Sequence, residues 1–361
     1  MDTELINKPL VEVRGRPMSV LDMLLGMKTL QASDLFLKTG GTVRFKISGR
    51  LVSFEGENIS HEHMDRVVAC FLTEEARATL HERKVADMVY GAPDGSRFRV
   101  HFALGQTGPY AAIRLIKQDI QPFTTLGLPG DVIQNMATLR GGLLVVCGTT
   151  DAGKTVTCTS MLDAINQSRE VAMLTLEDPI EYIFQDKRSM VFQREVGLHT
   201  ESFASGIRAA LRENLDVIFV GEMRGLETIE QVLRAAEMGH LVVSTLHADD
   251  VIACISRIVG SFPPEEQQRI RHSLAGVLEG IVFQRLLPKA KGGRVPCVET
   301  LFPNTAVRSI IRGGDLTKLG SYLGRSAGNR SFKESLQELL NSEAITRETY
   351  SEQMGNLPVA G

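Results

Sequence analysis

Eight residues have the spacing of a loop that binds nucleotide phosphates. They read Gly148-Thr149-Thr150-Asp151-Ala152-Gly153-Lys154-Thr155 and fit the pattern G-x-x-x-x-G-K-[ST]. In this pattern backbone N–H groups surround the phosphates, the lysine places its charge on the β- and γ-phosphates, and the final hydroxyl is offered to Mg²⁺. The loop therefore predicts ATP binding, with Lys154 on the phosphates and Thr155 on the metal ion.

Two carboxylates follow short apolar runs that read as strands. Glu222 comes just after Val217–Val220, and Glu177 comes directly after Met173–Leu176. In an open parallel sheet, ligand chemistry gathers at the carboxyl ends of the strands. A glutamate there can orient a water molecule, accept its proton or contact Mg²⁺. We expect both glutamates near the phosphate loop, and their residue type leaves open which one is the general base.

A histidine follows another apolar run. His247 stands three residues beyond Leu241–Ser244. An imidazole at the end of a strand can donate a hydrogen bond to a γ-phosphate. We therefore place His247 in the same predicted site.

The elements that must position these residues alternate between strands and helices. Apolar runs at 142–147, 172–176, 217–220 and 241–244 are short and continuous. Such runs, with helical segments between them, are typical of a parallel sheet that is buried on both faces. We expect a helix over 154–166, so that its N-terminus adds its dipole to phosphate binding.

The first third of the chain differs in pattern. Residues 1–119 are expected to form an α+β domain, with helices at 19–28 and 61–72 and a strand–turn–strand signal across 34–47. The segment 120–130 contains two prolines and two glycines and is interpreted as a linker.

The remainder is expected to form the ATPase core, 131–290, and a mostly helical C-terminal region, 291–361. The clearest helical patterns after Pro264 lie at 265–286 and 331–341.

Composition excludes several classes of protein. With 40 Lys and Arg against 43 Asp and Glu, the net charge is −3, so no nucleic-acid partner is expected. The five cysteines form no C-x-x-C pair, which argues against a zinc site or a disulfide scaffold and fits a reducing cytoplasm. The longest strongly apolar runs, such as 143–146, are too short to span a bilayer, so any membrane association is expected to go through a partner.

The order of these motifs resembles the secretion ATPases, which drive type II secretion, type IV pili and conjugation. The resemblance is carried by the phosphate loop, by Leu176–Tyr182, by Val220–Arg224 and by Gly239–His247. Within that family the chain is most similar to the retraction ATPases of type IV pili, the PilT group. Further matching segments are 257–259, 262–267, 284–288 and 306–312.

The resemblance implies a fold and a role for several residues. It implies a PAS-like N-terminal domain followed by a RecA-like ATPase domain, with Mg²⁺ and ATP between them. Glu177 falls in the acidic motif of the family and Glu222 in its Walker B motif, while His240 and His247 fall in its histidine motif.

The resemblance also implies partners. Family members are homohexamers at the cytoplasmic face of the inner membrane, held there by a pilus or secretion platform protein. Arginines of the N-terminal domain reach the nucleotide in this family, and Arg99 and Arg114 lie in the matching strands. The implied activity is ATP hydrolysis that powers pilus disassembly and twitching motility.

Several positions depart from the PilT pattern, among them Phe36, Asn214, Leu215 and Gly225, and two further departures bear on function. Asp151 stands where the phosphate loop of that group has glycine, and Ser309 stands where its C-terminal motif has asparagine. These departures keep two alternatives open. One is an accessory subunit of the PilU kind that hydrolyses ATP weakly and works with a paralogous ATPase. The other is a DotB-like motor of a type IV secretion or conjugation system.

Overall fold

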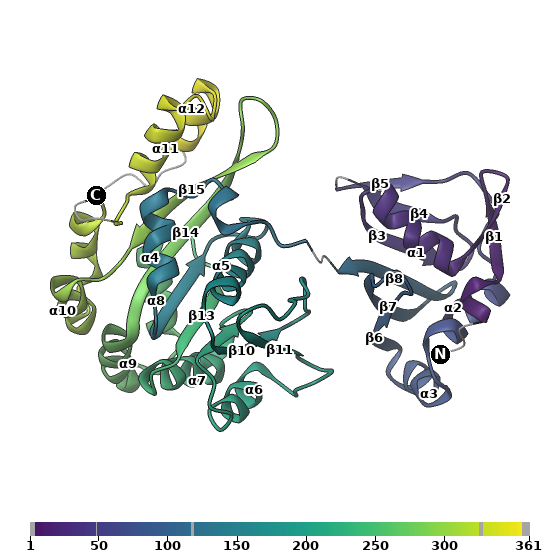
Figure 1. The fold of residues 1–361 in the computed structure, drawn as a ribbon, viewed down its shortest axis with the longest axis horizontal. Helices are drawn as coiled ribbons and strands as arrows, with labels where there is room; N and C mark the ends of the chain where they lie inside the picture. Colours follow the sequence, from purple (N-terminus) through teal and green to yellow (C-terminus); the bar gives the residue numbers. More distant parts are fainter. Residues whose placement is uncertain (1–3, 48, 117–118, 325–327, 356–361) are drawn as a thin grey trace. The chain divides into compact units, whose positions relative to one another are not determined.

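The computed structural model describes residues 4–355, except 48, 117–118 and 325–327. By their contacts the residues group into two compact units, Met1–Gln118 and Asp119–Gly361 (Figure 1). Each unit has hydrophobic clusters of its own. Within the described ranges, no helix is both long and apolar enough to cross a membrane.

The first unit is a six-stranded antiparallel sheet with helices packed on it. Its sheet order is β5-β4-β3-β8-β7-β6, and a separate hairpin pairs β1 with β2. The strands are β1 (Pro9–Val13), β2 (Arg16–Ser19), β3 (Ala32–Lys38), β4 (Arg44–Ile47), β5 (Arg50–Ser53), β6 (Val85–Gly91), β7 (Arg97–Gly105) and β8 (Gly108–Ile116). The helices are α1 (Val20–Thr29), α2 (His61–Phe71) and α3 (Glu74–Arg83), with a 3₁₀ turn η1 (Leu5–Asn7).

Alternation along β7 shows why this sheet has one covered face. Phe98, Val100 and Phe102 are fully buried, so the intervening Arg99 points to the opposite face. The expected helices near 19–28 and 61–72 are confirmed as α1 and α2, and the expected strand–turn–strand is the antiparallel pair β3–β4.

The second unit is built on a seven-stranded sheet in the order β11-β10-β12-β13-β9-β14-β15. All neighbouring pairs are parallel except β14–β15. The strands are β9 (Gly142–Cys147), β10 (Ala172–Glu177), β11 (Met190–Glu195), β12 (Val217–Val220), β13 (Leu241–Leu246), β14 (Leu278–Pro288) and β15 (Arg294–Leu301).

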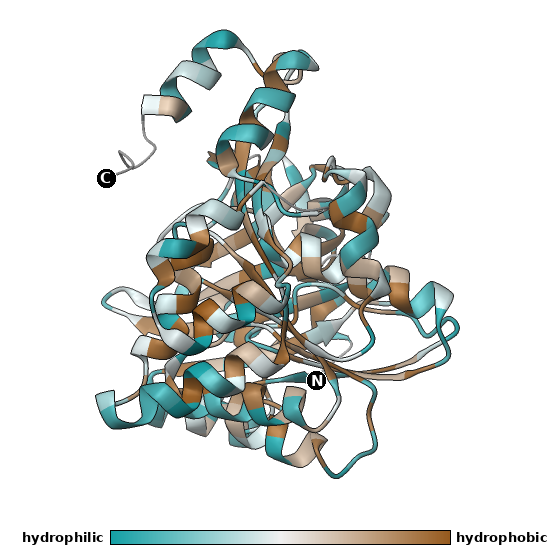
Figure 2. Cartoon of the chain, turned by 90° about the vertical axis from the view of Figure 1, so that its left-hand side faces the viewer, coloured by the Kyte–Doolittle hydropathy of each residue, from teal (hydrophilic) through white to brown (hydrophobic). Residues whose placement is uncertain are grey.

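The helices of this unit cover both faces of the sheet. They are α4 (Gly130–Thr138), α5 (Lys154–Ser168), α6 (Phe203–Ala210), α7 (Gly225–Glu237), α8 (Val251–Gly260), α9 (Pro264–Val277), α10 (Thr305–Gly313), α11 (Phe332–Asn341) and α12 (Arg347–Gly355), with 3₁₀ turns η2 (Phe123–Thr125) and η3 (Leu316–Tyr322). In Figure 2 the strands through the middle of this unit are largely brown, and teal residues lie on the outer sides of the helices.

Burial on both faces explains the continuous apolar runs. Along β9, Leu143 and Val145 join one hydrophobic cluster, and Leu144 and Val146 join another. A strand covered on both faces has no solvent side that would require polar residues at alternate positions. The predicted parallel strands, and the helix after the phosphate loop, are therefore confirmed.

One sequence-based expectation is wrong. The helix expected over 265–286 ends at Val277, and the chain continues as β14, which pairs with β9 and β15. The segment expected to be mostly helical, 291–361, also contributes β15 to the same sheet. A short buried apolar run is compatible with a helix and with a central strand. Here the run is a strand because it pairs with the edge of β9 that would otherwise be unpaired.

The proline- and glycine-rich segment has contacts within the second unit. Phe123 and Leu128 are buried in the cluster that also contains Leu144 and Met161. Gly130 begins α4, so the end of this segment is already helical.

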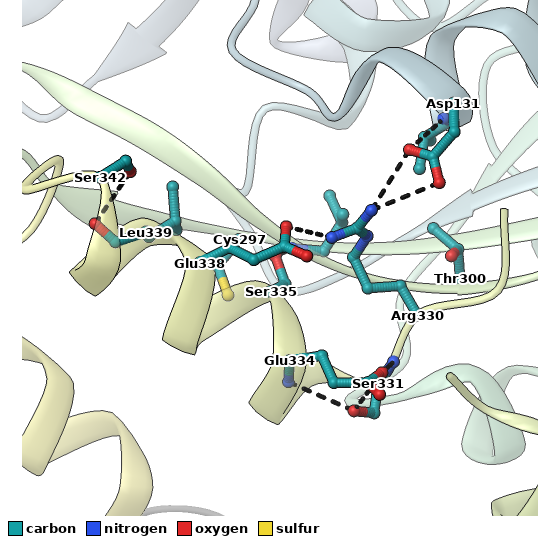
Figure 3. Close-up of polar contacts among 12 residues, drawn as sticks. Asp131, Cys297, Thr300, Arg330, Ser331, Glu334, Ser335, Glu338, Leu339 and Ser342 are labelled. Carbon is teal, nitrogen blue, oxygen red and sulfur yellow. Dashed lines mark hydrogen bonds and ion pairs between the residues drawn. The ribbon is translucent and has the colours of Figure 1, made fainter. Parts of the chain in front are cut away.

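A charged cluster ties the C-terminal helices to the start of α4 (Figure 3). The Arg330 guanidinium lies 3.3 Å from both carboxylate oxygens of Asp131 and also pairs with Glu338 of α11. The backbone of Arg330 exchanges two hydrogen bonds with Thr300 of β15. The cluster thus joins three elements that lie far apart in the sequence.

Candidate functional site

The phosphate loop connects β9 to α5 and has an unusual backbone. Asp151 and Gly153 adopt left-handed conformations, with φ of +61° and +84°. Such residues in a tight loop turn successive N–H groups toward one side, which makes a concave anion site. Glycine adopts this region freely, and aspartate tolerates it better than most residues with a side chain.

Lys154 at the start of α5 is folded back on this loop. Its Nζ donates to the carbonyl oxygens of Gly148 and Thr149, at 2.9 and 2.8 Å. Burial lowers the pKa of Lys154, and the nearby Glu222 opposes that effect. Phosphate oxygens can replace the two carbonyls as acceptors, so the ammonium is already positioned for an anion in the loop.

The loop faces a pocket of about 490 Å³ that lies entirely within the second unit. The carboxyl ends of β10, β12 and β13 form the side opposite the loop, as expected for the open edge of a parallel sheet. The residues that line it are Thr150, Asp151, Ala152, Gly153, Lys154, Thr155, Val156, Glu177, Asp178, Pro179, Glu181, Phe203, Phe219, Gly221, Glu222, Arg224, Thr245, His247, Leu286 and Arg294.

Glu177 is the last residue of β10 and is almost fully buried. The Thr175 hydroxyl donates to its Oε1 at 2.7 Å, and the Gln193 amide donates to the same oxygen at 3.3 Å. Burial raises the pKa of Glu177 to about 7, although these hydrogen bonds act in the opposite direction. A carboxyl group with such a pKa can accept and release a proton near neutral pH.

Glu222 lies two residues beyond β12 and is held differently. Arg224 Nε is 2.8 Å from its Oε2, and His247 Nε2 is 3.5 Å from its Oε1. The Arg224 guanidinium thus forms an ion pair with Glu222. The two glutamates thus share one pocket but have contrasting surroundings.

Hydrogen bonds between the strand ends fix the positions of these residues. The Thr245 hydroxyl donates to Gly221 O at 2.6 Å, and Met223 N–H donates to Thr245 O at 2.9 Å. Gly221 N–H donates in turn to Leu176 O at 2.8 Å. The ends of β10, β12 and β13 are therefore locked together beside the pocket.

His240 does not lie with this group. It precedes β13, its Nδ1 lies 2.9 Å from Ala235 O, and its carbonyl accepts from Gly142 N–H at the start of β9. The pocket is at the other end of these strands, and six residues at roughly 3.3 Å each separate the two ends. The structure thus brings together Glu177, Glu222 and His247 but places His240 at the opposite edge of the sheet.

Arg99 and Arg114 lie in the first unit, directly opposite each other on β7 and β8. Arg114 Nε is 2.8 Å from Asp34, and Arg99 is 3.4 Å from Asp87. Both arginines point away from the hydrophobic cluster of that unit, and their acidic partners hold them in place.

Three residues of this region were assigned no role from the sequence. Gln284 of β14 bonds the phosphate loop, Arg224 bonds Glu222, and Arg294 of β15 lines the pocket. Gln284 and Arg294 belong to the hairpin whose first strand was expected to be helical, so their position was hidden. Arg224 lies in the Walker B segment, where its spacing of two from Glu222 was the available signal.

The residues present suit a magnesium ion that accompanies a nucleotide. Thr155 and the two glutamates supply the hard oxygen donors that Mg²⁺ prefers. Among the described residues, no three acidic, histidine or cysteine side chains form a cage for a metal. Mg²⁺ at phosphate sites is usually held by one or two protein oxygens together with the phosphates and water, so such a cage is not required.

The chain matches known proteins along most of its length. The family model of the type II/IV secretion system proteins matches residues 19–349. The type IV pilus retraction ATPase PilT of Pseudomonas aeruginosa is 33% identical over 337 residues, which cover 93% of this chain and 98% of that protein. The type IV pilus ATPase PilU of the same organism is 31% identical over 319 residues, covering 88% of this chain and 83% of PilU.

Solved structures agree with this match. A crystal structure of the pilus retraction motor PilT with bound ADP superimposes with a TM-score of 0.86 at 40% identity, and it covers 93% of this chain and 96% of that one. The ATPase DotB of Legionella pneumophila gives a TM-score of 0.82 at 26% identity, covering 93% and 95%. With its phosphate loop, its strand-end carboxylates and these relatives, the chain belongs to the type II/IV secretion system protein family and is a PilT-like ATPase.

Proposed function

We propose that this chain is the subunit of a hexameric motor that couples ATP hydrolysis to type IV pilus retraction. The observation that carries the proposal is the meeting of Lys154, Glu177, Glu222 and His247 around one pocket. The match to PilT extends over nearly the whole of both chains, which supports the same use of that pocket.

In this proposal each side chain has a separate task. The loop N–H groups and Lys154 hold the phosphates, and Thr155 and Glu177 provide oxygen ligands for Mg²⁺. When bound, that ion would neutralise charge on the phosphates. Glu222 orients the attacking water and accepts its proton, because it is the more accessible glutamate and its carboxylate is paired with the Arg224 guanidinium. His247, on the far side of Glu222, is placed to donate a hydrogen bond to the γ-phosphate.

The remaining proposals concern parts of the assembly. We assign residues 1–119 to a PAS-like domain, 120–130 to a linker, 131–290 to the RecA-like core and 291–361 to a C-terminal region. Arg99 and Arg114 would complete the nucleotide site and stabilise charge on the γ-phosphate as an arginine finger does. The ring would work in the cytoplasm and dock on a membrane platform protein.

Phosphate release by the purified protein tests the activity. We expect turnover that requires both ATP and Mg²⁺ and that falls at least about a hundredfold in Lys154→Ala, since the ammonium is the main charge on the phosphates. Arg188→Ala, which removes an exposed ion pair with Glu170 away from the pocket, serves as a matched control and should keep full activity. Binding of ATP without turnover in the parent would favour the accessory, PilU-like alternative.

A genetic experiment tests the process. Cells that lack this chain should keep surface pili but fail to retract them, and the Lys154→Ala form should not restore retraction. Normal retraction together with a defect in protein secretion or conjugation would favour a DotB-like motor, the alternative supported by the close structural match to DotB.

A further inference from the structure

The phosphate loop rests on one side chain that belongs to neither of the segments flanking the loop. Gln284 of β14 is almost fully buried. Its Nε2 donates to Ala152 O at 2.7 Å, and its Oε1 accepts from the Thr157 hydroxyl at 2.8 Å. Both ends of the amide are therefore used, one on the loop and one on the first turn of α5.

The backbone around Gln284 also fits closely against the loop. A Cβ on Gly148 would lie 2.3 Å from the backbone carbonyl oxygen of Gln284, and a Cβ on Gly153 would lie 2.8 Å from the side-chain Nε2 of Gln284. Two glycines of the phosphate-binding pattern thus make room for β14 as well as for their own positive φ. Gln284 therefore contacts the loop at three positions, Gly148, Ala152 and Gly153.

The hydrogen bond to Ala152 determines the direction of a phosphate-binding donor. In a trans peptide the C=O and the next N–H point in opposite directions. Because Gln284 draws the Ala152 carbonyl toward β14, the N–H of Gly153 points away from β14, toward the pocket. The residues on either side of Ala152, Asp151 and Gly153, have left-handed backbones, and such conformations persist where surrounding contacts fix them.

We propose that Gln284 is a positioning residue for ATP binding, which holds the phosphate loop with its N–H groups directed into the pocket. The proposal deepens the assigned ATPase function and rests on it. It also explains why β14 must be a strand at this point, since its pairing with β9 places residue 284 beneath the loop.

The test compares nucleotide affinity with folding stability in the full chain. Affinity for a fluorescent ATP analogue and the temperature of unfolding would be measured for the parent and for Gln284→Ala, Gln284→Glu, Thr157→Val and Asn166→Ala. Asn166 is the matched control, because it is a fully buried amide on the same helix α5 that bonds Gln185 O and Lys187 N, far from the loop.

We expect both Gln284 variants to bind ATP at least about tenfold more weakly, since Ala152 O loses its donor. Glutamate has the size of glutamine but directs an acceptor at that carbonyl, so it decides the matter if the alanine variant fails to fold. Thr157→Val should show a smaller loss, because it removes only the bond that orients the amide. Asn166→Ala should unfold at a lower temperature yet bind ATP like the parent.

The outcomes separate this inference from the proposed function. Affinity within about twofold of the parent in folded Gln284→Ala or Gln284→Glu would overturn the inference alone. An equal loss of affinity in Asn166→Ala would show that stability is the cause and would also overturn it. If the parent binds ATP in a Gln284-dependent way but does not hydrolyse it, the inference holds and the proposed motor activity fails. A parent that does not bind ATP overturns both.

Discussion

At the scale of single residues, the two glutamates of the pocket have the same side chain but different electrostatic surroundings. Glu177 is buried and accepts only neutral hydrogen bonds, so its pKa rises to about 7. Glu222 contacts a guanidinium at 2.8 Å. The first is costly to ionise in the absence of ligand, whereas the second is paired with a cation, and this contrast supports the separate tasks proposed for them.

Glu177→Gln should stabilise the nucleotide-free protein in a pH-dependent way. The folded-state pKa of about 7 exceeds the ordinary value of 4.5. Below pH 4.5 Glu177 is protonated whether the chain is folded or not, so it carries no penalty. Between pH 4.5 and 7 the unfolded chain loses this proton while the folded protein keeps it, so the penalty on folding grows to about 3 kcal/mol and is constant above pH 7. Urea unfolding should therefore show a clear gain for Glu177→Gln at pH 8 and only a small one at pH 5, together with lost ATPase activity. An equal gain at both pH values would contradict this account.

Asp151→Gly should strengthen ATP binding. Asp151 is an exposed residue with φ of +61°, and its carboxylate is one of the charges near Lys154. Glycine adopts this conformation without cost, and removing the carboxylate ends its repulsion of the phosphates. We expect affinity to rise about three- to tenfold at low salt, an effect of a kcal/mol or so.

Asp151→Asn separates the two causes. Asparagine keeps the tolerance for positive φ but removes the charge. If repulsion dominates, Asn and Gly should bind ATP equally well, and the gain should shrink at high salt. A loss of affinity in both variants would instead assign Asp151 a positive role in nucleotide binding.

At the scale of elements, the hairpin β14–β15 joins the nucleotide loop to the C-terminal helices. Gln284 supports the loop, and the next residue, Arg285, donates to Gln353 of α12 at 3.0 Å. Alternate residues of a strand point to opposite faces, so one strand contacts the loop on one side and a C-terminal helix on the other. A single strand therefore contacts both the phosphate loop and α12.

Arg330→Ala should weaken the attachment of α11 without affecting nucleotide binding. The Arg330 side chain is only 14% exposed and pairs with Asp131 and Glu338 (Figure 3). Its partners are largely exposed, which limits the value of each ion pair, so we expect a loss of about 1–2 kcal/mol from the pairs and the packed stem together. Urea unfolding measures the change. Arg188→Ala, from an exposed ion pair, is the control and should have little effect.

At the scale of the whole molecule, the two units divide the tasks of the proposed motor. Among the residues that the structure describes, those that line the pocket all lie between Thr150 and Arg294, and the second unit has its own hydrophobic clusters. The first unit carries Arg99 and Arg114 on the uncovered face of its sheet.

A fragment of residues 119–355 should therefore fold and bind ATP but hydrolyse it slowly. Binding should match the full chain within a few-fold, because the phosphate loop and Gln284 are all present. Loss of a charge-stabilising arginine commonly costs about 10³-fold or more in turnover. Calorimetric unfolding, ATP affinity and phosphate release would test these points. Full turnover by the fragment would show that the arginines of the first unit are not needed.

The local patterns of this chain determined the parts that depend on short stretches of sequence. The phosphate loop, the parallel strands with their terminal carboxylates, and α5 all follow from spacing and burial periodicity within a few residues. The neighbourhood of Glu177 and Glu222 follows as well, because parallel strands bring their carboxyl ends to one edge.

Only the tertiary structure decided the rest. Residues 278–288 carry an apolar run that suits a helix or a central strand, and the open side of β9 makes it a strand. That choice places Gln284, more than a hundred residues away in sequence, beneath the loop. His240 and His247 are seven residues apart in one motif, yet the extended strand between them places them at opposite edges of the sheet. These positions are set by strand pairing between segments that are far apart in the sequence, and a local sequence pattern carries no information about that pairing.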